Sequence, residues 1–392
     1  MTVAAWLVLV CGALVLWTLF GFPLLLAWRA SRSAMPHVHV IGAADENLPT
    51  VTAIIPVHNG ERFLAAKLTS VLASKYPSSR LDVIVLSDGS TDGTDAIASE
   101  FATRERVRCV RLPKGGKAAA LTVAFPMTRS DVVLLTDVRQ QLDADCVRRL
   151  MSHFADPRIG VVSGTLRIRS GETAGEASTG LYWRYESWIR ENLGRIDSVL
   201  GATGPIYAIR RSLVRSLPAS CILDDMWLPM QAVLGGSRAV LDPAAIAWDY
   251  PTSLNSEFTR KVRTQAGLYQ LLRLEPRLLD PMRNRLFWSF LNLKIARLLL
   301  SHVLIVAAVA SAFLPMPWRV YALGAQALFY GLAMLDRFVA NGSAIKRISA
   351  PIAAFVTLVG AAFCAQAIFF RDPASLWKTT TVRELPSAGT PP

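Results

Sequence analysis

The sequence predicts an α/β fold in which a central domain, built on a mostly parallel sheet, is inserted between transmembrane helices. Of the 392 residues, 52% are hydrophobic, but the apolar excess lies in residues 3–28 and 286–370, and the middle has ordinary soluble composition. From residue 51 onward, short apolar runs alternate with helical patterns. Strands that alternate with helices in this way pair in parallel through right-handed crossovers.

The first apolar segment, residues 3–28, is an expected membrane anchor. It contains no charged residue and is longer than the ~20 residues that a helix needs to cross a bilayer. It lacks the basic start and the small-residue cleavage site of a secretory signal, so we expect it to remain on the protein. Arg29 and Arg32 follow it and no Lys or Arg precedes it, so the positive-inside rule places the central domain in the cytoplasm.

Three further transmembrane segments are expected toward the other end, after an amphipathic interfacial stretch and before a tail. We place the interfacial stretch at 276–295, the segments at about 296–314, 318–335 and 348–370, and the tail at 371–392. Four spans in all would put the C-terminus outside, although Lys378 and Arg383 in the tail do not fit that side. We therefore expect a multi-pass protein of the inner or plasma membrane.

The formal net charge is +13, and the densest basic cluster lies between residues 260 and 297, running directly into a membrane segment. Attraction to anionic lipid head groups, about 1 kcal/mol per basic residue near the surface, explains most of it. No nucleic-acid partner is expected, because a basic face interleaved with aromatic residues is missing. The five cysteines are scattered and show neither zinc spacing nor a disulfide framework, which suits a reducing compartment.

Polar residues stand at the carboxyl ends of three expected strands, 51–57, 82–88 and 131–137. Ligands of parallel sheets bind at the carboxyl ends of the strands. Three polar strand ends in one sheet therefore predict a binding site, and they read Pro56-Val57-His58-Asn59, Ser87-Asp88-Gly89 and Thr136-Asp137.

Two loop motifs near these strand ends allow a structural or a ligand-binding interpretation. The residues after Asp88 favour a turn and a helix N-cap, but Asp88 itself could accept a hydrogen bond from a base edge or a ribose. Residues 113–117, Pro-Lys-Gly-Gly-Lys, lack the spacing of a P-loop. They open a helix and so suit a phosphate, the alternative being a basic surface turn.

Two further motifs place like charges close together. Asp224 and Asp225 are expected at a helix start, where carboxylates act as caps. Side by side they also repel, which raises the proton affinity of one of them and suits a general base. Arg260 and Arg263 are spaced i,i+3, so both can point at one anionic group, or they form a solvated or lipid-facing helix surface.

In this order the motifs resemble those of the family-2 glycosyltransferases, over residues ~50–275 and in the membrane layout. The likeness is narrower to the membrane-embedded branch of polysaccharide synthases, with its cellulose, chitin, hyaluronan and poly-N-acetylglucosamine synthases. It implies a GT-A-type, Rossmann-like nucleotide-sugar-binding domain over residues 48–275. It also implies a nucleotide-sugar donor, usually a UDP-sugar, a divalent cation (Mg²⁺ or Mn²⁺) and inversion at the anomeric carbon.

The resemblance further implies roles for single residues. Asp225, with Asp224 as second choice, stands where the family has its catalytic base, and Asp137 stands where it has a metal-binding Asp. The remaining expected site residues bind the donor (Pro56, His58, Asp88, Lys117, Arg139, Arg260 and Arg263) or lie on the acceptor side (Thr203, Gly204 and Trp227).

The sequence departs from the family pattern in two motifs. Arg139 replaces the second Asp of Asp-x-Asp, but Mg²⁺ is commonly held by one or two carboxylates plus substrate phosphates and waters, so Asp137 alone suffices. Arg139 is expected either to pair with a neighbouring carboxylate or to touch the donor. Arg260 and Thr264 replace the Gln and Trp of Gln-x-x-Arg-Trp, which puts processivity in doubt more than catalysis.

We therefore expect an inverting, metal-dependent hexosyltransferase that extends a glycan at the cytoplasmic membrane face, in exopolysaccharide or cell-surface glycan synthesis. One alternative adds a single sugar to a lipid-linked acceptor, and another is an inactive glycosyltransferase-like scaffold of a secretion complex. The expected partners are a nucleotide sugar, a glycan or lipid-linked acceptor and membrane lipids. An oligomer or an export partner is expected as well, since three or four spans leave a narrow path.

Overall fold

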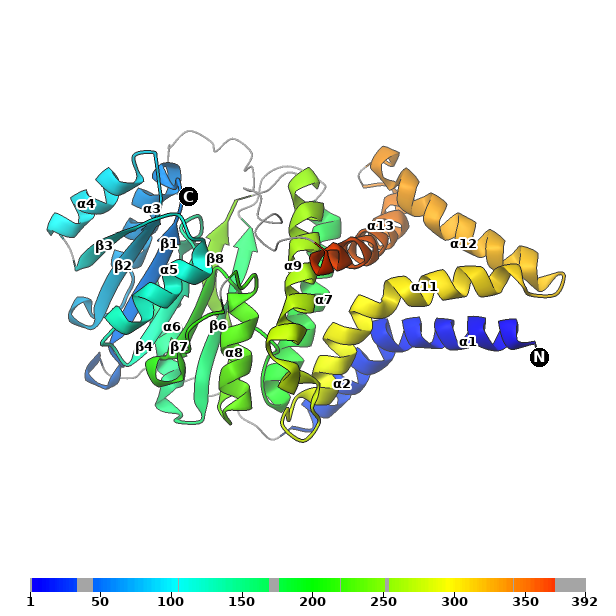
Figure 1. The fold of residues 1–392 in the computed structure, drawn as a ribbon, viewed down its shortest axis with the longest axis horizontal. Helices are drawn as coiled ribbons and strands as arrows, with labels where there is room; N and C mark the ends of the chain where they lie inside the picture. Colours follow the sequence, from blue (N-terminus) through cyan, green and yellow to red (C-terminus); the bar gives the residue numbers. More distant parts are fainter. Residues whose placement is uncertain are drawn as a thin grey trace.

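The computed structural model describes residues 2–33, 45–104, 106–168, 176–218, 220–250, 254–340 and 342–370. Within these residues, eight strands form one sheet in the order β3-β2-β1-β4-β7-β6-β8-β5 (Figure 1). The strands are Val51–Val57 (β1), Leu81–Asp88 (β2), Val107–Leu112 (β3), Val132–Thr136 (β4), Gln141–Leu142 (β5), Ile159–Ile168 (β6), Ile206–Arg210 (β7) and Arg238–Asp249 (β8).

The parallel part of the sheet is the part that the sequence predicts. Strand β1 pairs in parallel with β2 and with β4, and β2 pairs in parallel with β3. The α/β fold with its parallel strands is thus confirmed. The other half departs from it: β7 runs antiparallel between β4 and β6, and β5 runs antiparallel to β8.

Helices cover both faces of this sheet, because successive strand residues point to opposite sides. On β1, Ala53 and Ile55 enter one apolar cluster, and Ile54 enters the cluster on the other face. The first cluster is completed by helices α3 (Glu61–Leu72), α4 (Thr94–Arg104) and α6 (Cys146–Ser152). The second is completed by α5 (Lys117–Ala124) and α8 (Asp224–Leu234).

Two long helices, α7 (Glu176–Ile196) and α9 (Leu254–Leu274), stand between the sheet and the apolar helices (Figure 1). The second cluster continues through them into the apolar helices, since it includes Leu193 of α7, Leu271 of α9 and Phe290. Because one continuous apolar cluster spans both regions, the site at the sheet edge has a fixed position relative to these helices.

Three helices in the described residues are long and apolar enough to cross a membrane, namely Val3–Ser31, Phe287–Ala312 and Ala344–Phe369. The first consists of α1 (Val3–Leu16), a π-helical turn (Trp17–Gly21) and α2 (Phe22–Ser31). The second consists of α10 (Phe287–Phe290), a π-helical turn (Leu291–Ile295) and α11 (Ala296–Ala312). The third consists of α13 (Ala344–Cys364) and a 3₁₀ turn (Ala365–Phe369).

These helices differ from the expected layout in two respects. The second helix begins at Phe287, inside the stretch 276–295 that we expected to be interfacial. Helix α12 (Trp318–Leu335), which matches the expected segment 318–335, is not among the three, because Arg319 and Gln326 reduce its mean hydropathy. The tail at 371–392, with Lys378 and Arg383, lies outside the described residues.

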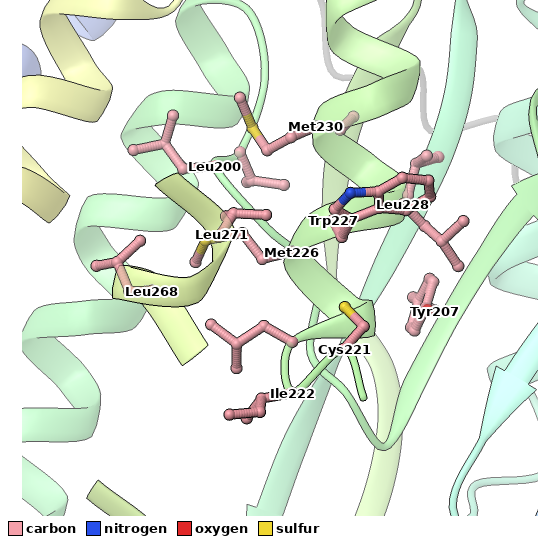
Figure 2. Packing of buried hydrophobic residues seen from close by; sticks show 14 of the residues in the cluster. Leu200, Tyr207, Cys221, Ile222, Met226, Trp227, Leu228, Met230, Leu268 and Leu271 are labelled. Atoms are coloured by element: carbon pink, nitrogen blue, oxygen red, sulfur yellow. The ribbon is translucent and has the colours of Figure 1, made fainter. Parts of the chain in front are cut away.

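Helix α9 holds the segment that leads into α8. The side-chain oxygen of Gln270 accepts a hydrogen bond from the backbone N–H of Ile222 at 2.9 Å, and its amide donates to the carbonyl of Ser220 at 3.0 Å. Figure 2 shows Cys221, Ile222 and Met226 packed beside Leu268 and Leu271 of α9.

Gly267 permits this close approach of α9. A Cβ at Gly267 would lie 2.6 Å from Leu223 Cγ and 2.9 Å from Ile222 Cγ2. The absence of a side chain on α9 therefore sets the position of the residues directly before Asp224.

We predict that Gly267→Ala lowers the stability of the protein by about 1–3 kcal/mol, because the added methyl overpacks the contact with Leu223. Gly194→Ala on α7 is the matched control, since its Cβ would meet only Leu241 N at 3.8 Å. That change should be neutral or stabilising by up to about 1 kcal/mol, as expected for Ala in a helix. Thermal unfolding of both variants in detergent measures the change in stability. Equal melting temperatures would contradict the packing role of Gly267.

Candidate active site

The predicted strand ends meet at one edge of the sheet, and β7 adds a fourth segment to them. Because β7 is antiparallel to β4, with Thr136 opposite Ile206, the residues that precede β7 lie beside Asp137. The hydroxyl of Thr136 donates a hydrogen bond to the carbonyl of Pro205 at 2.8 Å. The segment 201–205, which contains the expected acceptor-side residues Thr203 and Gly204, is thereby placed next to the end of β4.

Asp88, at the end of β2, positions the glycine loop that precedes α5. Its carboxylate accepts hydrogen bonds from the backbone N–H groups of Gly115 at 2.7 Å and of Gly116 at 2.9 Å. Gly116 has φ +84°, a conformation that favours glycine. His58 Nδ1 lies 2.8 Å from the carbonyl oxygen of Asp88, so His58 is also fixed at this strand end.

Lys117 follows this loop and connects three segments of the site. Its Nζ lies 3.0 Å from Asp137 Oδ1 and 3.2 Å from Asp224 Oδ1. Burial by itself lowers the pKa of Lys117, but the charges of Asp137, Asp224 and Asp225 together raise it above its usual range. The ammonium group therefore stays charged and neutralises part of this acidic cluster.

The adjacent carboxylates Asp224 and Asp225 have different environments. Asp224 is 5% exposed and, besides Lys117, accepts a hydrogen bond from the hydroxyl of Tyr207 at 3.1 Å. Burial, and next the charge of Asp224, raise the pKa of Asp225 to about 7, although Lys117 opposes this. Asp225 can therefore exchange a proton near neutral pH, as a general base must.

Gly204 lies directly against the Asp225 carboxylate. A Cβ at this position would be 2.7 Å from Asp225 Oδ2, and the backbone carbonyl of Asp225 accepts a hydrogen bond from Ala202 N at 2.7 Å. The segment 201–205 thus confines Asp225 from one side, while Thr203 is itself buried.

The remaining predicted residues lie at the margin of this arrangement or in the core. Arg263, on α9, feels the charges of Asp137 and Asp225, and Arg260 lies near it on the same helix. Pro56 is paired with Leu86 inside the sheet. Trp227 is 9% exposed and packs in the apolar cluster of Figure 2, so its side chain contributes to the core.

Arg139 takes the first of the two roles expected for it, because it pairs with a carboxylate. Its guanidinium donates to both oxygens of Asp249, at 2.8 and 2.6 Å, and Gln140 donates to the same carboxylate at 2.9 Å. Asp249 is the last residue of β8. Arg139 therefore ties the turn after Asp137 to the far half of the sheet.

Two basic residues, the half-buried Arg190 and the buried Lys67, support the site and were missed by the sequence reasoning. Arg190 of α7 donates to Thr203 Oγ1 and to Ser163 Oγ, each at 2.9 Å, and so supports the segment 201–205. Nothing in the sequence around Arg190 points to these partners.

Lys67, the other missed residue, had a recognisable signal. It is fully buried, and its Nζ donates to Thr136 Oγ1 and to the carbonyl of Gln140, each at 2.6 Å. Burial lowers its pKa to about 7. Residue 67 lies on the same apolar face of α3 as Leu64, Leu68 and Val71, so a lysine there must find buried acceptors.

The residues available to a metal ion are few. No group of three or more His, Cys, Asp or Glu side chains that could hold a metal occurs in the described ranges. The Asp137 carboxylate is 37% exposed, whereas that of Asp224 is 7% exposed. Asp137 is therefore the carboxylate with an accessible side toward a bound ion.

Sequence comparisons agree with this geometry. The profile described as glycosyl transferase family 2 matches residues 52–217. A probable glycosyltransferase of Bacillus subtilis (strain 168) is 28% identical over 216 residues, which cover 52% of this chain and 51% of that protein. A poly-beta-1,6-N-acetyl-D-glucosamine synthase of Staphylococcus epidermidis is 22% identical over 262 residues, covering 65% of this chain and 60% of the synthase.

Residues 52–217 of the chain therefore form a glycosyltransferase family 2 domain. The matched region spans about half to three fifths of the length of these relatives, 51% and 60% respectively. The solved structure of a mannosyltransferase from Pyrobaculum calidifontis, in complex with GDP-Man and Mn²⁺, matches with a TM-score of 0.70. The match covers 92% of this chain and 98% of that one at 21% identity, so it confirms the GT-A-type fold.

We predict that Gly204→Ala lowers sugar-transfer turnover roughly 10- to 100-fold, because the new methyl displaces the Asp225 carboxylate from its position. Gly201→Ala is the matched control in the same segment, since its Cβ would make ordinary contacts of 3.4 Å with Met226 Cγ and 3.5 Å with Asp225 O. Turnover of the two purified variants should differ by at least tenfold. Equal activity would mean that Gly204 does not position Asp225.

Proposed function

We propose that the chain transfers a sugar from a nucleotide-sugar donor, a UDP-sugar in our expectation, to a growing glycan at the cytoplasmic face of the cell membrane. The observation that carries this proposal is the Asp225 carboxylate, whose pKa is raised to about 7 beside the charged set Lys117, Asp137 and Asp224. Glycosyl transfer from a diphosphate requires a base for the acceptor hydroxyl and a positive charge that binds the phosphates. Asp225 and Lys117 would supply these two groups at one edge of the sheet.

Asp225 acts as the base in a single displacement. It takes the proton of the acceptor hydroxyl while the hydroxyl oxygen forms its bond to the anomeric carbon. The bond from that carbon to the diphosphate breaks with its electrons, through an oxocarbenium-like state. Attack from the face opposite the leaving group inverts the configuration at this carbon.

The donor lies at the strand ends in this proposal. Asp88, with His58 and Pro56 nearby, contacts the nucleoside, and the glycine loop that Asp88 positions brings Lys117 to the phosphates. Arg263, which feels the charges of Asp137 and Asp225, and Arg260 add positive charge where the diphosphate departs. Lys117 can serve both the carboxylates and the phosphates because its ammonium has three donors.

Asp137 would hold the divalent cation, Mg²⁺ or Mn²⁺. A single accessible carboxylate fits a cation of this kind, which commonly takes one or two carboxylates and completes its shell with substrate phosphates and waters. Bound there, the cation would neutralise charge that develops on the leaving diphosphate. The similar mannosyltransferase structure is described with Mn²⁺ and GDP-Man, which supports the choice of a divalent ion.

The alternatives differ in acceptor and in activity. A relative named as a poly-beta-1,6-N-acetyl-D-glucosamine synthase favours repeated addition to a polymer and makes UDP-N-acetylglucosamine the first donor to test. Addition of one sugar to a lipid-linked acceptor is the second candidate, favoured by Thr264 and Arg260, which replace the Trp and Gln of the processive motif. An inactive scaffold is the third, and the complete set Asp88, Lys117, Asp137 and Asp225 opposes it.

We predict that purified protein in lipid nanodiscs turns over radiolabelled UDP-N-acetylglucosamine or GDP-mannose with Mg²⁺ or Mn²⁺, and that Asp225→Asn lowers this turnover by roughly 10²- to 10⁴-fold. Donor binding by Asp225→Asn should remain, since it keeps the shape of the side chain. A ladder of products supports polymer extension, and one lipid-soluble product supports single addition. No turnover of any sugar nucleotide, or full activity of Asp225→Asn, would contradict the proposal.

A further inference from the structure

Lys294 is a charge in an apolar helix that no part of the proposed reaction uses. The helix Phe287–Ala312 contains one Lys and one Arg, Lys294 and Arg297, and no Asp or Glu. Arg297 has a counter-ion, because its guanidinium lies 2.5 Å from Glu186 Oε1 of α7. Within the described residues, Lys294 has no hydrogen-bond or ion-pair partner. Charged side chains at membrane depth are costly, so an unpaired one marks a functional site.

Lys117 and Lys294 approach the base from different elements. Lys117 begins α5 and contacts Asp137 and Asp224 at the sheet edge, whereas Lys294 lies one helical turn before Arg297, which contacts Glu186 of α7. The charges of four groups act on the ammonium of Lys294, namely those of Glu186, Arg297, Arg190 and Asp225. Lys117, in contrast, feels Asp137, Asp224 and Asp225. Asp225 belongs to both sets, so the charges of both lysines act on it. The acceptor hydroxyl must reach Asp225 as well, which leaves the side of Lys294 for the acceptor.

The backbone around Lys294 is also irregular. Lys294 lies in the π-helical turn Leu291–Ile295, and the N-terminal helix has a second π-helical turn at Trp17–Gly21. The two turns are joined, because Trp17 Nε1 donates to Asn292 Oδ1 at 2.8 Å. Tyr185 of α7 donates to the carbonyl of Leu19 at 2.6 Å and so adds a third helix. Single π-helical turns occur frequently at functional sites.

The local charge balance selects an anion as the ligand. Three cations, Lys294, Arg297 and Arg190, lie near two carboxylates, Glu186 and Asp225, so one positive charge is left over. Arg190 donates hydrogen bonds to neutral oxygens of Thr203, Ser163 and Gly201. The helix of Lys294 carries exposed apolar side chains on another face, with Trp288 67% exposed and Leu299 47% exposed. An anionic head group with an alkyl chain fits both properties, since the chain can lie along this surface.

We propose that Lys294, supported by Arg190, binds the phosphate of an anionic lipid that carries the acceptor, and holds it on the membrane side of Asp225. This inference rests on the proposed function, because it names the class of acceptor for the same site. A glycan that grows on a lipid phosphate and a single sugar added to a lipid-linked acceptor both satisfy it. A free polysaccharide end does not.

Native mass spectrometry of the full chain in detergent tests this with hexadecyl phosphate as the probe. The wild type should retain hexadecyl phosphate and not hexadecanol, and Lys294→Met should weaken retention roughly five- to tenfold. Lys294→Gln is the second neutral variant, for use if Lys294→Met does not fold, and Lys294→Arg should retain the lipid. Arg347→Met is the matched control, because Arg347 is an exposed cation on α13 and its loss removes the same charge.

Four results would overturn the proposal. Either equal retention by wild type and both neutral variants, or an equal loss in Arg347→Met, would show general surface attraction. Complete competition by equimolar inorganic phosphate would show a site for free phosphate and not for a lipid. Retention of hexadecyl phosphate without donor turnover would contradict the proposed function alone, whereas donor turnover without lipid retention would contradict this inference alone.

Discussion

The site depends on the Lys117 ammonium group, which lies between Asp137 at the end of β4 and Asp224 at the start of α8. Removal of Lys117 would leave the buried Asp224 carboxylate without its counter-ion, which costs about 3–5 kcal/mol. The position of Lys117 depends in turn on Asp88, whose carboxylate binds the two glycine N–H groups before it. Lys117 forms ion pairs with Asp137 and Asp224, and Tyr207 also donates a hydrogen bond to Asp224. Asp225 is therefore the carboxylate left to take a proton.

The antiparallel strand β7 places a second segment of the chain beside this charge cluster. In a fully parallel sheet the segment before the neighbouring strand would lie at the opposite edge. Here Thr136 stands opposite Ile206, so residues 203–205 lie at the edge that carries Asp137. Gly204 then leaves space for Asp225, and Arg190 connects the segment to β6 and to α7. Since α7 also contacts the apolar helix Phe287–Ala312 through Glu186 and Arg297, the base and the apolar helices form one connected structure.

Local pattern predicted the parallel half of the fold and the polar strand ends, because strand periodicity and position in an α/β unit are properties of short segments. It did not predict β7, nor the pairing of Arg139 with Asp249, since these residues are 110 positions apart and nothing in either segment indicates the other. Arg190 was missed for the same reason. Trp227 was placed on the acceptor side by its neighbours in sequence, whereas the turn of α8 directs it into the core. Lys67 alone had a local signal, an amine on the apolar face of an amphipathic helix.

The central claim is that Asp225 is the base and that Asp224 and Lys117 set its proton affinity in opposite directions. The dependence of kcat/KM on pH, which reports ionisations of the free enzyme, tests this most directly. The active form is deprotonated, so wild-type activity should fall as the pH drops below about 7, the value to which the pKa of Asp225 is raised. Asp224→Asn removes a like charge and should move this acid limb to lower pH, whereas Lys117→Met removes a cation and should move it to higher pH. An acid limb that shifts in the same direction in both variants, or in neither, would contradict the account.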